Sequence, residues 1–378
     1  MPFRRPGPAR ELARKLAREL TSPGRLICSH PSCILLAGTQ MIRPSLIVLL
    51  SWVCSWICLA SPAVAAGIDA AAINGADFGT SKPPPEDRIN ALVVKVQVLL
   101  DRARFSPGEI DGKLGENAQK ALKAFADAKG LTPNRPLTAD VWKALAATSS
   151  DPAIIEYKIA KDDVKGPFLD KLPAKIEDMK DLKALSYTSP REALAEKFHM
   201  SEDLLEALNP GKKFDQAGEA IFVTNVAKND ARLKVARIEI DKERQTLKAF
   251  SKSGELVAFF PATVGSEEKP TPSGTLKVES SDANPNYRYH PDYKFKGVKS
   301  KEMFDIKPGP NNPAGSYWIG LSAEGYGIHG TPNPSKVSKT ESHGCVRLTN
   351  WDVTLLGKSV KKGTPVEFVG PPQSARKS

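Results

Sequence analysis

The sequence predicts a multidomain protein that ends in a mainly-β domain, and three observations support this. Its 378 residues exceed what one hydrophobic core usually supports. Helical periodicity dominates the first half that follows an apolar leader, whereas short alternating strands separated by Pro and Gly fill residues 231–370. Beyond the leader the chain keeps a single cysteine, Cys345, and it falls inside the β-rich region.

Residues 1–66 are predicted to be a leader with a signal peptide. The apolar run Leu46–Leu59 follows Arg43 and precedes the small residues 61–66, which is the order of a cleavable signal. Met41 stands where such a signal would begin, so we expect translation to start there. The alternative is an uncleaved anchor, but the run is short for a membrane span. We expect export and no stable membrane span after cleavage.

The leader carries much of the positive charge. The whole chain has a net charge of +11, whereas residues 67–378 hold 46 basic and 41 acidic residues, a net charge of +5. Nucleic-acid binding would require a clustered basic face, so we expect no nucleic-acid partner. A mildly basic exported protein suits an anionic polymer such as cell wall.

A small three-helix domain is predicted at residues 88–147, after a flexible Ala-, Gly- and Pro-rich tether at 67–87. Apolar residues recur every three or four positions between Ile89 and Leu100. A second helix at 117–128 is followed by Gly130, and a third begins near Thr138. An anonymous helical bundle is the alternative.

The next segments are predicted as a linker and a small α/β module. Residues 148–184 are charged and lack clear periodicity, which indicates a linker. Residues 185–226 have the pattern strand, helix, helix, strand. The predicted strands lie at 186–188 and 220–224, and the predicted helices lie at 193–198 and from Ser201 onward.

Residues 231–370 are predicted to form a β-rich barrel or sandwich. One helix is expected from Thr349 or Asn350 to about Val360. The expected strands are 235–240, 246–250, 255–264, 274–278, 317–320, 326–329 and 365–369.

The candidate chemistry centres on Cys345, in Ser342–Arg347, and on His329, sixteen residues upstream. A thiol attacks as its thiolate, and a nearby imidazole is the usual means of generating one. Export permits disulfides, yet a single cysteine has no partner within the chain. The alternative is that Cys345 is a buried small apolar residue.

Neighbouring residues suit a nucleophile site. Gly344 would allow substrate to approach the backbone, and N–H groups around Cys345 could hold a developing oxyanion. Arg347 could bind a substrate carboxylate or form a surface salt bridge, and His343 could be structural. By type, His329, His343 and Cys345 could bind zinc, but no second cysteine or HExxH pattern supports that, so we expect no metal and no cofactor.

Residues 308–321 and 326–353 strongly resemble the L,D-transpeptidase (YkuD) catalytic domain. The shared signature is a histidine, a spacer of about a dozen residues, Ser-His-Gly-Cys and a following arginine; here the spacer is 330–341. The resemblance extends back to Val235, with residues 271–278 as a further family-like strand. It implies a YkuD-like barrel or sandwich.

The resemblance also implies site roles. Cys345 matches the nucleophile and His329 the general base. Gly330 matches the residue whose carbonyl orients that base, and His343 and Gly344 match the turn that shapes the oxyanion hole. The implied substrate-binding positions are Arg347, Ser342 and Tyr326.

Such enzymes attack the peptide stem of peptidoglycan at diaminopimelate, expel D-alanine and form a thioester. An amine acceptor then gives a diaminopimelate–diaminopimelate cross-link, or an envelope protein is joined to the wall. With water as acceptor the same site is an L,D-carboxypeptidase. A third hypothesis is a non-enzymatic peptidoglycan-binding protein.

Two further resemblances concern the modules that precede the β-rich region. Residues 110–131, with the closing Trp and Leu of 142–145, resemble a peptidoglycan-binding domain. Residues 187–201 and 204–210 resemble a degenerate LysM module, in which the usual Gly-Asp is replaced by residues 189–191. These resemblances imply glycan and stem peptides of peptidoglycan as partners. With the leader, they also imply a periplasmic protein associated with the cell wall.

Overall fold

The computed structural model describes residues 68–79, 88–227, 232–267, 269–293 and 298–370. The predicted leader at 1–66, with its start at Met41, lies outside the described residues. Within the described ranges, no helix is both long and apolar enough to cross a membrane.

Three helices occupy the region where three were expected. They are α3 (Ala91–Arg102), α4 (Glu116–Ala128) and α5 (Ala139–Ala146). Asn90 caps α3, because its side-chain oxygen accepts the N–H groups of Leu92 and Val93 at 2.9 and 3.2 Å. The apolar faces meet in one core, which also contains Phe259 of the β-rich region. The helical region is therefore packed against the β-rich region.

The segment expected to be a flexible tether contains a short helix, α2 (Ala70–Gly75). Asp69 caps it by accepting the Ala72 N–H at 2.7 Å, and Ile73 is fully buried. The Asn74 side chain pairs with the backbone of Ile154, accepting its N–H and donating to its carbonyl, both at 2.9 Å. These contacts fix residues 70–75 in place, which composition alone did not indicate.

The βααβ order is present, but its first strand lies elsewhere than expected. Strand β1 (Ile154–Lys158) pairs antiparallel with β2 (Ala220–Thr224), and α6 (Pro190–Lys197) and α7 (Glu202–Leu208) lie between them in the chain. The predicted strand at 186–188 is wrong. Tyr187 instead accepts the Leu169 N–H through its carbonyl at 2.9 Å and donates its hydroxyl to Glu196 at 3.0 Å. β1 falls in the predicted linker, where the short helices η1 (Lys161–Asp163) and η2 (Ile176–Asp181) also lie.

An eight-stranded sheet forms the β-rich region, as expected for a mainly-β domain. Its order is β11 (Val346–Arg347), β10 (Gly327–His329), β9 (Tyr317–Leu321), β6 (Gly274–Ala283), β12 (Pro365–Val369), β3 (Arg237–Asp241), β4 (Thr246–Phe250) and β5 (Leu256–Pro261). Just after β5, Thr263 exchanges two backbone hydrogen bonds of 2.9 Å with Arg347 of β11. The two ends of the sheet therefore meet, and the sheet curls on itself.

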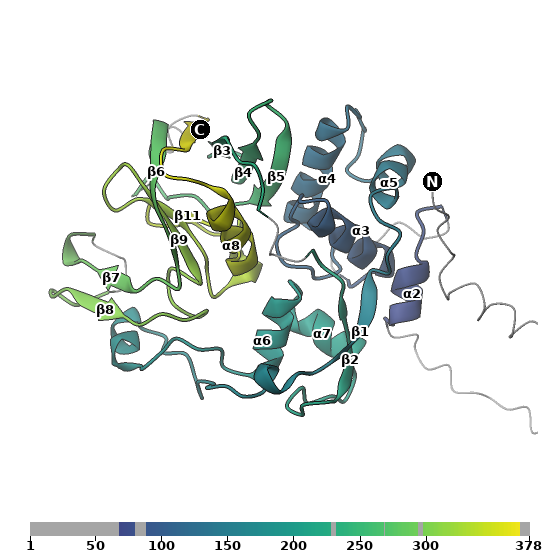
Figure 1. Cartoon of the computed structure of the whole chain (residues 1–378), viewed down its shortest axis with the longest axis horizontal. Helices are drawn as coiled ribbons and strands as arrows, with labels where there is room; N and C mark the ends of the chain where they lie inside the picture. The colour runs from purple at the N-terminus through teal and green to yellow at the C-terminus, as the bar shows by residue number, and fades with distance from the viewer. Residues whose placement is uncertain (1–67, 80–87, 228–231, 268, 294–297, 371–378) are drawn as a thin grey trace, which may run out of the picture. The chain divides into compact units, whose positions relative to one another are not determined.

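One helix, α8 (Asn350–Ser359), packs against β6, β9 and β10, close to its expected position (Figure 1). Thr349 caps it by accepting the Asp352 N–H at 3.2 Å. The alternation of β3 explains the packing, because Ile238 and Ile240 are fully buried while the residue between them faces outward.

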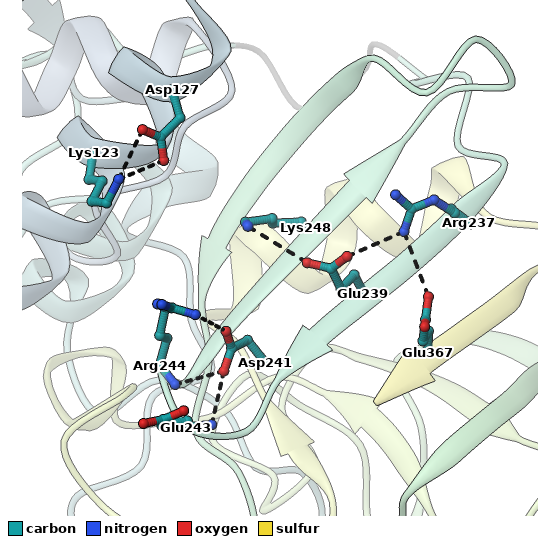
Figure 2. A network of polar contacts seen from close by, with 9 residues as sticks. All are labelled: Lys123, Asp127, Arg237, Glu239, Asp241, Glu243, Arg244, Lys248 and Glu367. Atoms are coloured by element: carbon teal, nitrogen blue, oxygen red, sulfur yellow. Dashed lines mark hydrogen bonds and ion pairs between the residues drawn. The ribbon is translucent and has the colours of Figure 1, made fainter. Parts of the chain in front are cut away.

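That outward residue, Glu239, belongs to a ladder of charges on the outer face of the sheet (Figure 2). It pairs with Lys248 at 3.6 Å and with Arg237 at 3.4 Å, and Arg237 also reaches Glu367 at 4.0 Å. Exposed pairs of this kind contribute roughly 0–1 kcal/mol each. The main effect of these charged residues is therefore to keep the outer face of the sheet exposed to solvent, with Ile238 and Ile240 in the core.

Two short strands, β7 (Tyr287–Tyr289) and β8 (Phe304–Ile306), form a separate pair (Figure 1). They were not predicted, since three residues are too few to show a period. The rings of Tyr289 and Phe304 stack with centroids 4.7 Å apart. The remaining short helices are η3 (Pro291–Tyr293) and η4 (Pro334–Lys336).

Candidate active site

The turn that carries Cys345 is fixed on both sides by the segment that follows β5. The Ser342 N–H donates to the Val264 carbonyl at 2.8 Å, and the Ser266 N–H donates to the Ser342 carbonyl at 3.0 Å. On the other side, Arg347 is paired with Thr263 as described above. Curling of the sheet therefore positions this turn.

Ser342 and Gly344 shape the turn from within. The Ser342 hydroxyl donates to the Cys345 carbonyl and accepts the Gly344 N–H at 3.2 Å. Ser342 is buried and lies outside the cavity lining, so its position indicates support of the turn more than contact with substrate. Gly344 has φ +103°, and a Cβ there would lie 2.8 Å from the Tyr326 ring, so only glycine fits without movement.

His329 is positioned at the end of β10. This strand runs parallel to β11, with His329 opposite Arg347, and the Leu348 N–H donates to the His329 carbonyl at 2.9 Å. The His329 Nδ1 lies 2.7 Å from the Gly330 carbonyl oxygen. A carbonyl can only accept, so Nδ1 carries the proton and Nε2 is left as the acceptor.

A cavity of about 780 Å³ collects most of the predicted site residues. This is within the usual size of small-molecule sites. The predicted residues that line it are Cys345, His329, His343, Arg347 and Tyr326. Gly330, Gly344 and Ser342 lie behind this lining and hold its members in place.

Burial keeps both reactive groups neutral. Desolvation, aided by the charge of Arg347, lowers the pKa of His329 to about 3, against the opposing hydrogen bond to Gly330. Desolvation raises the pKa of the Cys345 thiol above its ordinary value, although a Gly327 backbone hydrogen bond and Arg347 oppose it. Near pH 7 the cavity is therefore lined by a neutral thiol and a neutral imidazole.

The charged groups on the cavity wall are predominantly basic, which suits a substrate that carries carboxylates. The basic residues are Lys175, Lys269, Arg288 and Arg347, and the acidic ones are Asp282 and Glu324. Burial lowers the pKa of Arg347, whose Nη1 donates to the Glu341 carbonyl at 3.4 Å.

Sequence reasoning missed two supporting residues. The Trp318 ring stacks on His329, with centroids 5.6 Å apart and planes at 20°. The Asn350 side-chain oxygen accepts the Ser316 N–H at 2.9 Å, and it would lie 2.1 Å from a Cβ at Gly330. Both stand in the family-like stretch, but a single sequence gives no reason to choose them over their neighbours.

By residue type, His329, His343 and Cys345 could bind a metal ion. Across the ranges that the structure describes, no group of three or more His, Cys, Asp or Glu side chains is arranged to hold a metal ion.

Comparison with known proteins gives the family. Residues 235–368 match the L,D-transpeptidase (YkuD) catalytic domain. A putative L,D-transpeptidase YkuD from Bacillus licheniformis is 30% identical over 179 residues, which cover 47% of this chain and 92% of the relative. The chain belongs to the L,D-transpeptidase family. The YkuD domain therefore contains the cavity residues Cys345 and His329.

Other similarities are more partial. A probable L,D-transpeptidase YbiS from Escherichia coli is 33% identical over 143 residues, which cover 36% of this chain and 46% of the relative. The chain thus matches less than half of that relative's length. A solved L,D-transpeptidase from Mycobacterium smegmatis is 19% identical with a TM-score of 0.30, covering 40% of this chain and 64% of that one. A score this low supports no conclusion, so family membership depends on the sequence matches.

Proposed function

We propose that this protein is a peptidoglycan L,D-transpeptidase that forms diaminopimelate–diaminopimelate cross-links, or attaches proteins to peptidoglycan, through a thioester on Cys345. The observation that carries the proposal is that His329 and Cys345 line one basic cavity, with the tautomer of His329 set by Gly330. A cysteine thiol and an imidazole with an unprotonated Nε2, both lining one cavity, are the groups that cysteine acyl transfer uses.

The neutral pair implies how the first step proceeds. His329 Nε2 takes the thiol proton as the sulfur attacks the diaminopimelate carbonyl carbon, so the thiolate does not accumulate beforehand. The tetrahedral oxyanion is held by N–H groups of the turn around Cys345. The amine of the departing D-alanine takes the proton from His329 as the C–N bond breaks, and the thioester remains.

The second step uses the same groups in reverse order. An acceptor amine attacks the thioester carbonyl and gives its proton to Nε2 of His329. The C–S bond breaks, the sulfur recovers that proton, and a new amide bond forms. Water in place of the amine would give the carboxypeptidase reaction.

We propose further that residues 88–147 bind peptidoglycan and that the protein is exported to the periplasm. We also propose that residues 185–226 belong to a LysM-like module whose first strand is β1 (Ile154–Lys158), which precedes them in the chain. The 179 residues aligned with the Bacillus licheniformis relative exceed the length from Val235 to Ser378. Part of that similarity therefore lies before the YkuD domain, which supports an accessory module there.

The test is intact-protein and product mass spectrometry with a disaccharide-tetrapeptide, comparing wild type with Cys345→Ala. We expect a cysteine-dependent acyl adduct, loss of D-alanine and a cross-linked dimer. Cysteine-dependent tripeptide without dimer, even when an amine acceptor is added, would favour the carboxypeptidase. A folded wild type that gives neither adduct nor product would favour the non-enzymatic binding protein.

A further inference from the structure

A segment from outside the YkuD domain forms part of the catalytic cavity. Between β1 and α6 the chain makes a long excursion, of which we call residues 169–187 the strap. Ala174, Lys175 and Ile176 of the strap line the same cavity as Cys345. The YkuD family model matches residues 235–368, so these three residues lie outside that domain.

The strap is fastened to the catalytic domain near the cavity. One carboxylate oxygen of Glu177 accepts two backbone N–H groups, from Lys299 at 2.5 Å and from Ser300 at 2.8 Å. Both donors lie on the segment that leads into β8. A carboxylate that accepts two amides makes charge-assisted bonds, which are stronger than neutral ones. This contact holds the residues on either side of Glu177, including Lys175, at the cavity wall.

A second fastening lies at the C-terminal end of the strap. The Leu185 N–H donates to the Pro308 carbonyl at 3.0 Å, and the Asn311 N–H donates to the Leu185 carbonyl at 2.9 Å. The backbones approach so closely that a Cβ at Gly309 would lie 2.2 Å from the Leu185 carbonyl oxygen. Gly309 therefore permits the contact, and the strap is fixed at two points on the C-terminal side of Lys175.

We propose that Lys175 is a binding subsite for a carboxylate of the peptide stem. The substrate identity rests on the proposed function. A peptide stem carries carboxylates beyond the bond that is broken, and Lys175 lines a cavity that is also lined by Arg347 and Lys269. A lysine on a long flexible stem can pair with such a group without a fixed geometry. The strap would thereby make the accessory region part of substrate recognition.

The first test is independent of the reaction. Cys345 is alkylated with iodoacetate, which is anionic, and with iodoacetamide, which is neutral. The quantity measured is the rate constant for iodoacetate divided by that for iodoacetamide. We expect the ratio to fall about 3- to 10-fold in Lys175→Glu, because the variant repels the anionic reagent. The control is Lys180→Glu, which reverses an exposed lysine of η2, the short helix that follows Lys175, outside the cavity lining. It should leave the ratio near that of wild type. Equal ratios in all three proteins would overturn the proposal.

The second test uses the disaccharide-tetrapeptide. In Lys175→Glu we expect KM to rise on the order of 10-fold with kcat within about 2-fold, since the lysine acts in binding alone. An unchanged KM would overturn the subsite. If wild type turns over no stem peptide at all, the proposed function fails, while the alkylation ratio still decides whether Lys175 attracts anions at this cavity.

Hydrogen bonds between α6 and the catalytic domain support a second inference, which concerns how His329 is held in place. Helix α6 packs beside α8, and two of its glutamates, one turn apart, accept hydrogen bonds from the catalytic domain (Figure 1). Glu192 accepts from the Asn311 side chain and Glu196 from the Asn350 side chain, both at 2.9 Å. The two hydrogen bonds have the same length, but their donors, Asn311 and Asn350, lie in different parts of the catalytic domain.

Only the Glu196 contact continues to the catalytic base. The Asn350 amide donates to Glu196 and to the Pro310 carbonyl at 3.1 Å, and these bonds fix its oxygen against Gly330. The Gly330 carbonyl in turn accepts Nδ1 of His329. Asn350 and His329 are both buried, so each link is shielded from water.

We infer that Glu196 is a positioning residue for His329, acting through Asn350 and Gly330. It contacts no reacting atom. Without its carboxylate, Asn350 loses one of two acceptors, the Gly330 peptide is free to turn, and His329 loses the bond that keeps Nε2 unprotonated. The accessory module is in this way part of the machinery that selects the histidine tautomer.

The test compares Glu196→Ala, Glu196→Gln and the matched control Glu192→Ala. Both alanine variants should lower thermal stability, because each breaks a contact between α6 and the catalytic domain. Only Glu196→Ala should lower kcat, by about 10-fold with KM little changed, and it alone should add the Nε2-protonated form of His329 to long-range proton–nitrogen NMR spectra. Glu196→Gln keeps an oxygen acceptor and should restore both readouts. Equal losses of kcat in the two alanine variants, or a single unchanged tautomer, would show that Glu196 is merely structural.

Discussion

At the scale of single residues, burial changes the chemistry of the reactive pair. A thiolate–imidazolium pair would require the low pKa to belong to the cysteine, but here burial raises the pKa of Cys345 and lowers that of His329 to about 3. Both changes favour uncharged forms. In the proposed mechanism, attack and proton transfer are therefore coupled, and the tautomer of His329 matters more than its charge.

This leads to a prediction for the pH dependence of Cys345 alkylation by iodoacetamide. The rate should keep rising above the ordinary thiol pKa of about 8.5, because the thiolate forms late. In His329→Asn the midpoint should stay nearly the same, since a neutral imidazole contributes no charge. A rate that is already at its plateau near neutral pH would contradict this and would indicate a preformed ion pair.

A second residue-scale prediction concerns Gly344. Gly344→Ala combines a left-handed backbone with a Cβ 2.8 Å from the Tyr326 ring, so the turn or the ring must move. We expect kcat/KM to fall at least about 10-fold, because displacements of the order of 1 Å at reacting groups are that costly. Gly363→Ala is the control, since Gly363 also has positive φ (+87°) but nothing within 4 Å of its Cβ position. It should lose only about 1 kcal/mol of stability and keep its activity.

At the level of helices and strands, the elements predicted correctly are those whose evidence lies within their own residues. Strands β4 and β12 and helix α8 lie where they were expected, because periodicity and caps such as Thr349 are local properties. β1 was missed because its partner, β2, lies more than sixty residues away and its five residues stand in a charged context. A strand was expected at 186–188 as the first element of a strand, helix, helix, strand pattern, but the side chain and carbonyl of Tyr187 are used in other contacts.

The same distinction applies to the site. Cys345 and His329 could be chosen because their residue types carry chemistry, and the structure brings them to one cavity. Glu196 and Lys175 could not be chosen, since a glutamate and a lysine in a charged stretch look like any others. Only the tertiary fold shows that they reach Asn350 and the cavity wall.

An element-scale prediction concerns the contact between β5 and the helical region. Phe259 of β5 belongs to the core formed by α3, α4 and α5, and its N–H donates to the Arg104 carbonyl at 2.9 Å. Phe259→Ala should lower the free energy of unfolding by about 3–5 kcal/mol, as expected for a buried phenylalanine. Phe222→Ala, at a site that is 41% exposed, is the control and should cost much less. Equal small losses in chemical denaturation would show that the helical region is not packed on the sheet.

At the scale of the whole molecule, buried polar groups collect where α3, α6 and α8 meet. His199 pairs with Asp101 at 2.8 Å and stacks on Trp351 with ring centroids 5.0 Å apart. The Ser106 hydroxyl donates to Asp352 at 2.8 Å. These contacts join the helical region, the βααβ module and the catalytic domain, so the described parts depend on one another and do not hang from flexible linkers. Removing residues 88–147 would leave Asp352 without Ser106, which makes deletion a poor test of that region's function.

The junction also sets how stability depends on pH. Desolvation raises the pKa of Asp352, Glu196 and Glu109 to about 7 each. The folded protein therefore binds more protons than the unfolded chain between about pH 4 and 7, and the stability that these groups contribute is lost as the pH rises through this window. His329 acts in the opposite direction, because its contribution is lost as the pH falls from about 6.5 towards 3. Because three carboxyls oppose one histidine, the free energy of unfolding is expected to be larger on the acidic side of neutrality.

We therefore predict that the free energy of unfolding decreases as the pH rises from about 5 to 7, by a few kcal/mol, at about 1.4 kcal/mol per unit of pKa change for each group. Asp352→Asn removes one of the three groups and should flatten the slope. Asp305→Asn is the control, because Asp305 is exposed and its pKa is lowered by the Arg288 bond, so its titration falls below this window and the slope should match wild type. Urea denaturation at several pH values measures all three proteins. Two results would contradict this: a wild type that becomes more stable from about pH 5 to 7, or an Asp352→Asn variant with an unchanged slope. Either would mean that the three carboxyls are ionised within the fold and that the junction is more hydrated than its burial indicates.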